Sequence, residues 1–579
     1  MIVSSSIVIL LMMSLLTRFF NIQVYSYEKY SMKADVNRIR AISLNAPRGL
    51  ITDRNGTIIV DNYPTYVLTG IPGEMGDESQ IFKIVSECTG IDTVVLKTNY
   101  KKYYRGKFLP SRIAKDLTFD QLSRIEEHKT DLAGINYTQF PERTYSNKIN
   151  ASHLLGYVKE VDHALINELP DPDQYVFGDL VGWRGLEKVY ENNLRGKKGV
   201  YFIEVDAFGR EIGISTDREA QYPVPGNNLL TSIMLPLQEM LEEKLEGHKG
   251  IALVSNPRTG EILAFVSKPD YPANLFTGKT SVDKWKKIIS DPEKPLLNRI
   301  THGLYPPGST LKMITVMSLL EKRKVNFSET VDCKGVYTLG NRDFRCWKED
   351  GHGPVNLEEA IAQSCNIYFY DVVQRLSIDE WAESCRLFGF GSKTGIDLYS
   401  EARGIVPTSS FLTKHYGRWG WSKGHLLNIS LGQGELVATP IQMLQYINLL
   451  ATKGHTRGLH MLKNRKSKKV EISTFSKNTW DKIDFYMQKV INSPRGTGKR
   501  SNPKIPGVIV AGKTGTAQNP HGDDHAWYIG YAKNQNDIAS VVILVEQGGH
   551  GGETAAPIAR SVFELLFSSN ESIRLAFSQ

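Results

Sequence analysis

Cysteine is scarce in this sequence, with five residues among 579. Small secreted domains that depend on disulfides are dense in cysteine, so this composition excludes a disulfide scaffold. Cys88 and Cys385 stand apart, whereas Cys333, Cys346 and Cys365 fall within one segment. The positions of those three therefore matter more than the total number.

Basic segments with interleaved aromatic residues are also missing. The formal net charge is +8, but the basic residues are scattered, and the one dense run covers 463–469. A short run of this kind is more often a solvated loop than a nucleic-acid patch. We therefore expect no nucleic acid among the partners. No period of 20–50 residues indicates a repeat architecture.

The N-terminus lacks charge, since Arg18 is the first charged residue and an apolar run precedes it. A cleaved signal peptide would have basic residues before that run and a small-residue cleavage site, and we find neither. A buried core helix is disfavoured by the polar stretch that follows. We expect residues 2–24 to be an uncleaved, single-pass transmembrane anchor, with Arg18 snorkelling toward the membrane surface. The bulk of the chain would then lie on the extracytoplasmic side.

Two further regions follow the anchor. Residues 25–230 read as a helical juxtamembrane stalk (25–45) and a pedestal of short strands and helices, with a hairpin turn at Asn55-Gly56 and no catalytic constellation. Residues 231–570 begin after the turn-rich segment 225–228. Strands are expected at both ends of this region and helices between them, which predicts an α+β domain with one mostly antiparallel sheet flanked by helices. The expected strands are 251–255, 262–266, 508–511, 527–531 and 540–545, and the expected helices are 235–245, 309–323, 357–363 and 373–388.

The first chemical motif is Ser309-Thr310-Leu311-Lys312, which follows Tyr305-Pro306-Pro307-Gly308. Helical positions i and i+3 share a face, so Lys312 can reach the Ser309 hydroxyl. A serine hydroxyl is a weak nucleophile until a base takes its proton, and a lysine can be that base if burial lowers its pKa. Alone, the motif is also compatible with an ordinary serine helix cap.

Two more motifs lie downstream. In Ser364-Cys365-Asn366 the serine can relay a proton, and the amide can hold a substrate carbonyl and NH. In Lys513-Thr514-Gly515-Thr516, expected on a strand, Gly515 would leave room for a substrate along the strand edge. Lys513 could bind a carboxylate. The backbone N–H of Thr516 could form an oxyanion hole with that of Ser309.

Together, in this order and spacing, the three motifs are the set found in penicillin-binding proteins and class A β-lactamases. Over nearly its whole length the chain resembles a class B penicillin-binding protein, a monofunctional peptidoglycan D,D-transpeptidase. The resembling segments include APRGLITDRNG (46–56), Arg143, HLLGYV (153–158), NPRTGEILAFVSKPDYPAN (256–274), YPPGSTLK (305–312), LGQGELVATPIQM (431–443) and AGKTGTAQ (511–518).

The resemblance implies a mechanism and partners. Ser309 would attack a D-Ala-D-Ala stem peptide, and an acceptor amine would resolve the acyl-enzyme to give a cross-link. β-Lactams would acylate the same serine. Lys312 would be the base, Ser364 and Asn366 would move the proton and hold the amide, and Lys513 with Thr514 would bind the substrate carboxylate. No catalytic cofactor is implied. The pedestal would be of the dimerisation type, and a partner membrane protein would polymerise glycan.

Two other readings remain open at this point. A carboxypeptidase or β-lactamase would use the same serine, although a secreted β-lactamase would be far shorter and would lack the anchor and pedestal. A non-catalytic sensor or scaffold is the second alternative, and intact motifs count against it.

We also expect a structural zinc site formed by Cys333, Cys346, His352 and Cys365, which fall within about thirty residues. Three cysteines and one histidine are a closed structural zinc set. The resemblance supports this expectation, because some members of the family carry a metal at corresponding positions. The alternatives are a Cys333–Cys346 disulfide and three unrelated buried thiols.

Overall fold

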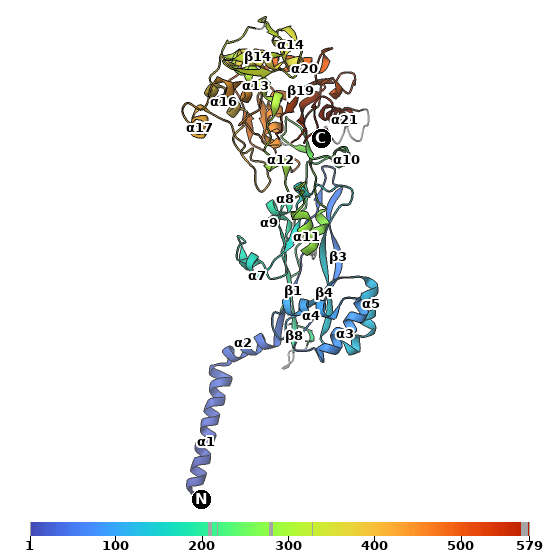
Figure 1. Ribbon diagram of the computed structural model, residues 1–579. Coiled ribbons are helices and arrows are strands. Elements are labelled where there is room, and N and C mark those ends of the chain that lie inside the picture. The colour runs from blue at the N-terminus through green and yellow to red at the C-terminus, as the bar shows by residue number, and fades with distance from the viewer. Residues whose placement is uncertain are drawn as a thin grey trace.

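The molecule is elongated in the computed structural model, with the N-terminal helix at one end and the largest domain at the other (Figure 1). The structure describes residues 2–205, 211–216, 218–276, 282–326, 328–520, 522–568 and 577. The last two residues of the expected catalytic region, 569 and 570, lie outside this set.

The first element is the apolar helix α1 (Ile2–Phe20), which continues as a π-helical turn (Asn21–Tyr25). Residues Ser5–Tyr25 have a mean hydropathy of 1.9, and none of this stretch is buried against the rest of the chain. By length and composition the helix can cross a membrane. Because a free apolar helix would be unstable in water, its lack of protein contacts is consistent with a membrane anchor.

The predicted stalk is only partly helical. Helix α2 (Tyr27–Arg38) is followed by strand β1 (Ile39–Leu44), which pairs antiparallel with β8 (Gly199–Val205), and β8 pairs in turn with β9 (Glu211–Ile214). The expectation of a helix through residue 45 is therefore wrong for 39–44. A partner strand about 160 residues away overrides the local helical preference.

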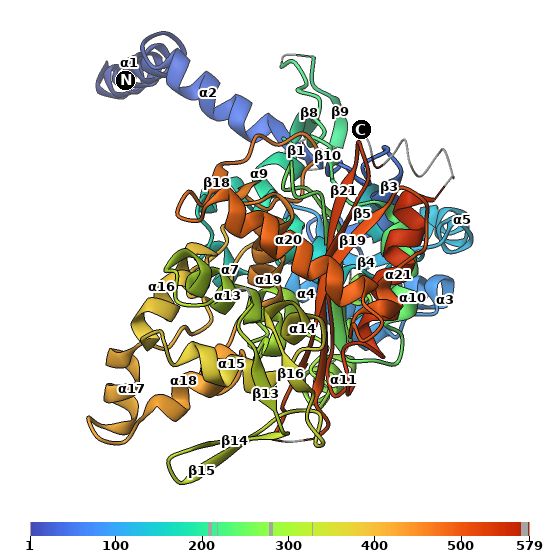
Figure 2. The same ribbon diagram turned by 90° about the horizontal axis from the view of Figure 1, so that it is seen from above.

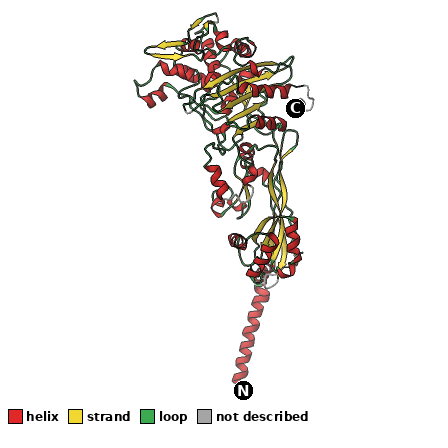
Figure 3. Cartoon of the chain, turned by 45° about the vertical axis from the view of Figure 1, so that its right-hand side comes forward, coloured by secondary structure: helices red, strands yellow, loops and turns green. Residues whose placement is uncertain are grey.

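The pedestal is built around two long paired strands, visible as the yellow ribbons between the two ends in Figure 3. β5 (Ile135–Tyr145) pairs along its whole length with β3 (Ile58–Gly70), and β2 (Ile51–Thr52) forms the predicted hairpin with β3. Asp53 closes that hairpin by accepting from the N–H groups of Asn55 and Thr57. The other pedestal elements are β4 (Ser111–Leu117), α3 (Glu78–Thr89), α4 (Thr93–Lys102), α5 (Phe119–Glu127), α6 (Ser152–Leu155), β6 (Val158–Glu160), α7 (His163–Ile166), β7 (Leu180–Gly182), α8 (Gly185–Val189), α9 (Glu191–Leu194) and β10 (Leu229–Leu230).

A buried ion network holds the upper pedestal together. The Glu187 carboxylate is fully buried and accepts from Arg48 Nε at 2.6 Å and from Arg143 Nε at 2.7 Å. Arg48 also donates to Glu191 at 2.6 Å. Charges this far from water are stable only when paired, so the network ties three separate chain segments to one another.

The C-terminal domain contains one five-stranded sheet in the order β12-β11-β21-β20-β19, and every neighbouring pair is antiparallel. This confirms the expected α+β fold. The strands are β11 (Gly250–Ser255), β12 (Ile262–Lys268), β19 (Ile509–Ala517), β20 (His525–Lys533) and β21 (Ile538–Val545). Because β19 lies at the end of this order, one of its edges remains open to other partners.

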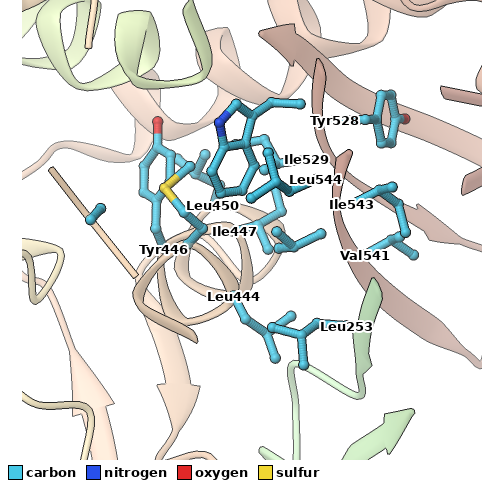
Figure 4. Packing of buried hydrophobic residues seen from close by; sticks show 14 of the residues in the cluster. Leu253, Leu444, Tyr446, Ile447, Leu450, Tyr528, Ile529, Val541, Ile543 and Leu544 are labelled. Atoms are coloured by element: carbon cyan, nitrogen blue, oxygen red, sulfur yellow. The ribbon is translucent and has the colours of Figure 1, made fainter. Parts of the chain in front are cut away.

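Helices cover both faces of this sheet (Figure 2). α10 (Leu235–Lys244) and α21 (Ala555–Phe567) contact each other on one face, and α19 (Pro440–Ala451) packs against the other. On α19, Ile447 lies on the side of Ile529 and Leu544, and Leu444 lies beside Leu253 of β11 (Figure 4). α19 is buried along its whole length, so this helix forms the centre of the core.

The remaining elements surround the predicted motifs. The helix expected over 373–388 begins at Ile378, because Ser377 caps it and residues up to Val373 belong to the preceding helix. The remaining elements of the C-terminal domain are α11 (Val282–Ile289), α12 (Arg299–His302), α13 (Lys312–Glu321), β13 (Val331–Cys333), β14 (Val336–Leu339), β15 (Arg342–Arg345), β16 (Gly353–Val355), α14 (Leu357–Ala362), α15 (Asn366–Val373), α16 (Ile378–Leu387), α17 (Ser409–Tyr416), α18 (Lys423–Ser430), β17 (His455–Arg457), β18 (Lys469–Glu471) and α20 (Lys477–Asn492).

Candidate active site

Ser309 lies in a tight 3₁₀ turn, Gly308–Leu311, and α13 begins only at Lys312. In a 3₁₀ turn residues i and i+3 eclipse, so Ser309 and Lys312 lie on one side of the chain, as expected, although by a different helix type. Gly308 has φ +59° and donates its N–H to the carbonyl of Gly432 at 2.9 Å. That hydrogen bond fixes the position of the serine turn against the segment that contains Gly432.

Lys312 is fully buried beneath the serine turn. Its ammonium donates to the carbonyl of Ser364 at 2.8 Å, to the Ser364 hydroxyl at 3.3 Å and to Asn366 Oδ1 at 2.8 Å. Burial lowers the pKa of Lys312 to about 8. All three hydrogen bonds are made to neutral groups, and the neighbouring Cys365 and Cys346 offset only part of the cost of burying the charge.

Ser364 lies in the short connection between α14 and α15, as the sequence predicts. Its backbone is left-handed, with φ +57°, which is uncommon for a residue with a side chain. The peptide N–H of Cys365 donates to the carbonyl of Ala360 at 2.9 Å, and Asn366 opens α15. Strain of this kind concentrates where a side chain must be held in one position.

Lys513 approaches the same hydroxyl from strand β19. It is fully buried, and its ammonium donates to Ser364 Oγ at 2.9 Å and to the carbonyl of Thr514 at 2.9 Å. Burial, and then the charge of Lys312, lower the pKa of Lys513 well below its usual range. Two lysines therefore contact one serine hydroxyl inside a dry site.

Gly515 is required for packing, in addition to the role expected from the sequence. A Cβ on this residue would lie 2.9 Å from Thr310 Cγ2 and 3.1 Å from the carbonyl oxygen of Pro307. Glycine is required here so that the serine turn can pack against β19. The close packing also places Thr516 beside the turn, because a Cβ on Gly308 would lie 2.9 Å from the carbonyl oxygen of Thr516.

A cleft of about 530 Å³ opens over these residues. Its volume falls in the usual range of small-ligand sites. Lys312 and Lys513 lie beneath it, so the hydroxyls of Thr514 and Thr516 are better placed than Lys513 to contact a substrate carboxylate directly. Five of the predicted catalytic and substrate-binding residues line the cleft (Ser309, Ser364, Asn366, Thr514 and Thr516), as does the predicted metal ligand Cys346.

Sequence reasoning missed a large part of the cleft lining. Thr497 accepts from the Thr514 hydroxyl at 2.7 Å and lies in a glycine-rich turn, which was the one local signal available. Leu431 and Gln433 belong to a segment that carries the family resemblance but had no assigned role. The other missed residues are Arg345, Trp347, Gly496, Lys499, Arg500, Gln518, Asp524, His550, Gly552 and Glu553.

The predicted metal ligands converge in a cluster of Cys333, Cys346, His352 and Cys365, here called the Cys₃His cluster. All four donor atoms lie within 4.8 Å of one another. His352 Nδ1 is 3.5 Å from Cys333 Sγ and 3.6 Å from Cys346 Sγ. Each of the five cysteines is a free thiol. The cluster could hold a metal ion.

The Cys₃His cluster is joined directly to the active site. The peptide N–H of Asn366 donates to Cys346 Sγ at 3.4 Å, and Cys365 precedes Asn366 in the chain. Hydrogen bonds from neighbouring groups, chiefly the Cys365 thiol and then His352, lower the pKa of Cys346. A thiol that ionises readily is suited to metal ligation.

Two family models cover most of the chain. The model described as "Penicillin binding protein transpeptidase domain" covers residues 250–564, and the one described as "Penicillin-binding Protein dimerisation domain" covers residues 43–231.

Relatives and solved structures agree with these models. A peptidoglycan D,D-transpeptidase MrdA from Acinetobacter baumannii is 31% identical, over 99% of this chain and 88% of the relative. The MrdA of Escherichia coli K12 is 27% identical, over 98% of this chain and 93% of the relative. A complex of penicillin-binding protein PBP2 with MreC from Helicobacter pylori superposes with a TM-score of 0.81 at 30% identity, covering 91% of this chain and 100% of that one.

Proposed function

Because this chain belongs to the penicillin-binding protein family as a class B member of the MrdA type, we propose that Ser309 is its nucleophile and Lys312 the base that activates it. The protein is a peptidoglycan D,D-transpeptidase and a target of β-lactams. One observation supports the assignment of roles above the others. Ser364 Oγ lies between two fully buried lysines, one from the serine turn and one from β19.

The proposed reaction begins with proton transfer from Ser309 Oγ to neutral Lys312. The oxygen attacks the carbonyl carbon of the penultimate D-alanine, and the backbone N–H groups of Ser309 and Thr516 stabilise the oxyanion. The C–N bond to the terminal D-alanine then breaks. Its nitrogen takes the proton through Ser364, and the acyl group remains on Ser309. An acceptor amine attacks the carbonyl carbon of this ester and gives a proton to neutral Lys312. The bond between that carbon and Ser309 Oγ then breaks, Lys312 returns the proton to Ser309 Oγ, and the cross-linked peptide leaves with a new amide bond.

Substrate positioning would use the remaining motif residues. Asn366 Oδ1 accepts from Lys312 and Asn366 Nδ2 donates to the carbonyl of Arg345, which fixes the orientation of the amide so that its second N–H can meet a substrate carbonyl. Thr514 and Thr516 would bind the terminal carboxylate, and Lys513 would keep the potential behind them positive.

Labelling with a fluorescent penicillin tests the assignment. The variant Ser309→Ala should lose covalent labelling, by a factor on the order of 10⁴–10⁶ in rate if it behaves like other serine enzymes. Its melting temperature should not change, because the half-buried hydroxyl has no structural role that we can identify. Ser364→Ala is the contrasting variant, since it should slow labelling without moving the labelled site. Labelling of Ser309→Ala at any other residue would contradict the proposal.

We further infer that the Cys₃His cluster binds a structural zinc ion. With Zn–S near 2.3 Å and Zn–N near 2.05 Å, a tetrahedral site has an S···N edge of about 3.6 Å. The two sulfur–nitrogen distances in the cluster are 3.5 Å and 3.6 Å, as this geometry requires. The free thiols do not favour the alternative Cys333–Cys346 disulfide. The ion would fix the chain around Ser364 and take no part in proton transfer.

Elemental analysis of the purified protein decides between the metal and its alternatives. We expect one zinc per chain, lost in Cys365→Ser together with a lower melting temperature. A protein without metal whose Cys333 and Cys346 are found linked by mass spectrometry would contradict the zinc site.

We also propose a division of the chain into an anchor (2–24), a stalk and pedestal (25–230) and a transpeptidase domain (231–570). A peptidoglycan synthase complex that coordinates polymerisation and cross-linking superposes with a TM-score of 0.72 at 27% identity, covering 100% of this chain and 98% of that one. By analogy with this complex and with the MreC complex, the partners would be a membrane glycan polymerase and a cell-shape protein. Co-purification from detergent-solubilised membranes tests both, and recovery of neither would contradict this proposal.

A further inference from the structure

Three consecutive residues, Arg345, Cys346 and Trp347, form one wall of the active-site cleft together with Ser309 and Asn366. Arg345 is the last residue of the β14–β15 hairpin, which projects from the domain, and Cys346 and Trp347 follow it (Figure 2). The middle residue belongs to the Cys₃His cluster. The two flanking side chains are solvent-exposed, and Trp347 retains 53% of its accessible surface.

The backbone of this wall is tied to the catalytic loop. The carbonyl of Arg345 accepts from Asn366 Nδ2 and from the Tyr370 hydroxyl, both at 3.4 Å. The indole N–H of Trp347 donates to the carbonyl of Gln363, the residue before Ser364, at 3.1 Å. The backbone of Arg345 and the indole of Trp347 are therefore held in place beside the nucleophile, and this is the preorganisation that a binding residue needs.

Arg345 has no ion-pair partner within the described part of the chain, although it lines the cleft proposed above to bind a peptide that ends in a carboxylate. The nearby arginine Arg375, by contrast, is paired with Glu329. A guanidinium that lines a cleft with its donors unused is suited to bidentate recognition of a carboxylate. An exposed indole beside it offers an apolar face to an aliphatic chain.

We propose that Arg345 and Trp347 form a specificity subsite for a second carboxylate of the stem peptide, one outside its D-Ala-D-Ala end. Arg345 binds that carboxylate, and Trp347 packs against the aliphatic chain that carries it. The terminal carboxylate is bound elsewhere, near Thr514 on β19, so the two anionic groups of the donor are held by different walls of the cleft. This subsite rests on the transpeptidase function proposed above and adds a determinant of donor choice to it.

Two synthetic stem peptides test the subsite on the detergent-solubilised full-length protein. Both end in D-Ala-D-Ala, and they differ only in an upstream side chain that ends in a carboxylate or in the corresponding carboxamide. Release of D-alanine in the presence of an acceptor amine gives kcat/KM for each. We expect the wild type to prefer the carboxylate by about tenfold, the size of one well-placed charged hydrogen bond. Arg345→Gln should abolish the preference by slowing the carboxylate peptide alone, chiefly through KM.

Two other variants serve as controls. Arg342→Gln changes the same residue type in the same strand at a position away from the cleft, and it should keep the preference. Trp347→Ala should slow both peptides several-fold and leave their ratio unchanged. Fluorescent penicillin labelling of Ser309 should persist in all three variants.

Failure of the subsite and failure of the catalytic proposal give different results. If Arg345→Gln slows both peptides equally, or neither, while penicillin still labels Ser309, the subsite is refuted and the nucleophile stands. If Arg345→Gln loses penicillin labelling, the residue supports the loop rather than the substrate, and the subsite is also refuted. If the wild type releases no D-alanine and is not labelled at Ser309, the catalytic proposal itself fails.

Discussion

Replacing Glu187 by glutamine should destabilise the pedestal far more than any exposed charge change. The carboxylate is fully buried between Arg48 and Arg143, at 2.6 and 2.7 Å from their Nε atoms. Arg48 would still be paired with Glu191, but Arg143 would lose its carboxylate partner and keep only neutral oxygens, such as Asn62 Oδ1 at 3.3 Å. Removing one partner of a buried ion pair typically costs about 3–5 kcal/mol, because an unpaired charge is left out of water.

The same residue predicts a pH dependence. Burial acts to raise the pKa of Glu187, but Arg48 and Arg143 outweigh it and hold that pKa below its usual value. A carboxylate whose pKa is depressed in the folded state stabilises the fold above its unfolded pKa, about 4.3, and loses that contribution as pH falls through the folded pKa. The free-energy difference between wild type and Glu187→Gln should therefore be largest near neutral pH and shrink below about pH 4.

Hydrogen–deuterium exchange of pedestal peptides measures this local stability without requiring the whole chain to unfold in one step. The control is Glu126→Gln, which breaks a pair with Lys129 that is 41% and 48% exposed and should cost at most about 1 kcal/mol. Penicillin labelling should remain in both variants, since the pedestal holds none of the proposed catalytic residues. If Glu187→Gln costs no more than Glu126→Gln, the network does not hold the pedestal and the reasoning fails.

Three further outcomes are expected from penicillin labelling. The labelling rate should rise about tenfold from pH 7 to pH 9, because the base must be neutral and burial lowers the pKa of Lys312 to about 8. A labelling rate that does not change with pH would argue against Lys312 as the base. Gly432→Ala should slow labelling at least about tenfold, since its Cβ would lie 2.3 Å from the Gly308 carbonyl oxygen. The control Gly434→Ala should slow labelling less, because Gly434 has a similar positive φ but its Cβ would meet nothing closer than 3.8 Å. Equal effects of the two variants would show that backbone strain alone is responsible. Removal of residues 1–24 should give a protein that leaves the membrane fraction and is still labelled, and retention in membranes would place the anchor elsewhere.

Features that depend on local pattern were predictable from the sequence. The hairpin at Asn55-Gly56 and the sheet strands around residues 251–266 are confirmed, because turn residues and runs of apolar residues act over a few positions. The helix at 357–362 and the strand that carries Lys513 are confirmed for the same reason. The first strand of the stalk was missed because its stability comes from β8, and no signal within residues 39–44 reveals that partner.

The part of the site that was missed depends on distant contacts. Thr497 reaches the cleft only because β19 passes beside it, and Arg345 and Trp347 reach it only because the Cys₃His cluster and the catalytic loop hold their backbone. The packing role of Gly515 also depends on a contact that is distant in the sequence. Its place in the motif was recognised, but the neighbour that requires a glycine, the turn containing Thr310, lies 205 positions earlier in the chain and could not be identified without the fold.

The two buried lysines explain why the base can be neutral at physiological pH. Lys312 and Lys513 both donate to Ser364 Oγ, at 3.3 and 2.9 Å, and their other hydrogen-bond acceptors in the described part of the chain are neutral oxygens. Two like charges that share a hydroxyl in a dry site repel each other strongly, and loss of one proton removes that repulsion. Burial lowers the pKa of both lysines, and the charge of Lys312 lowers that of Lys513 further, so the pair holds its second proton weakly. Lys312 in its neutral form can accept the nucleophile's proton, and the single positive charge left on the pair favours binding of the substrate carboxylate. Ser364, held in a strained backbone conformation between them, is the group through which that proton can pass to the leaving nitrogen.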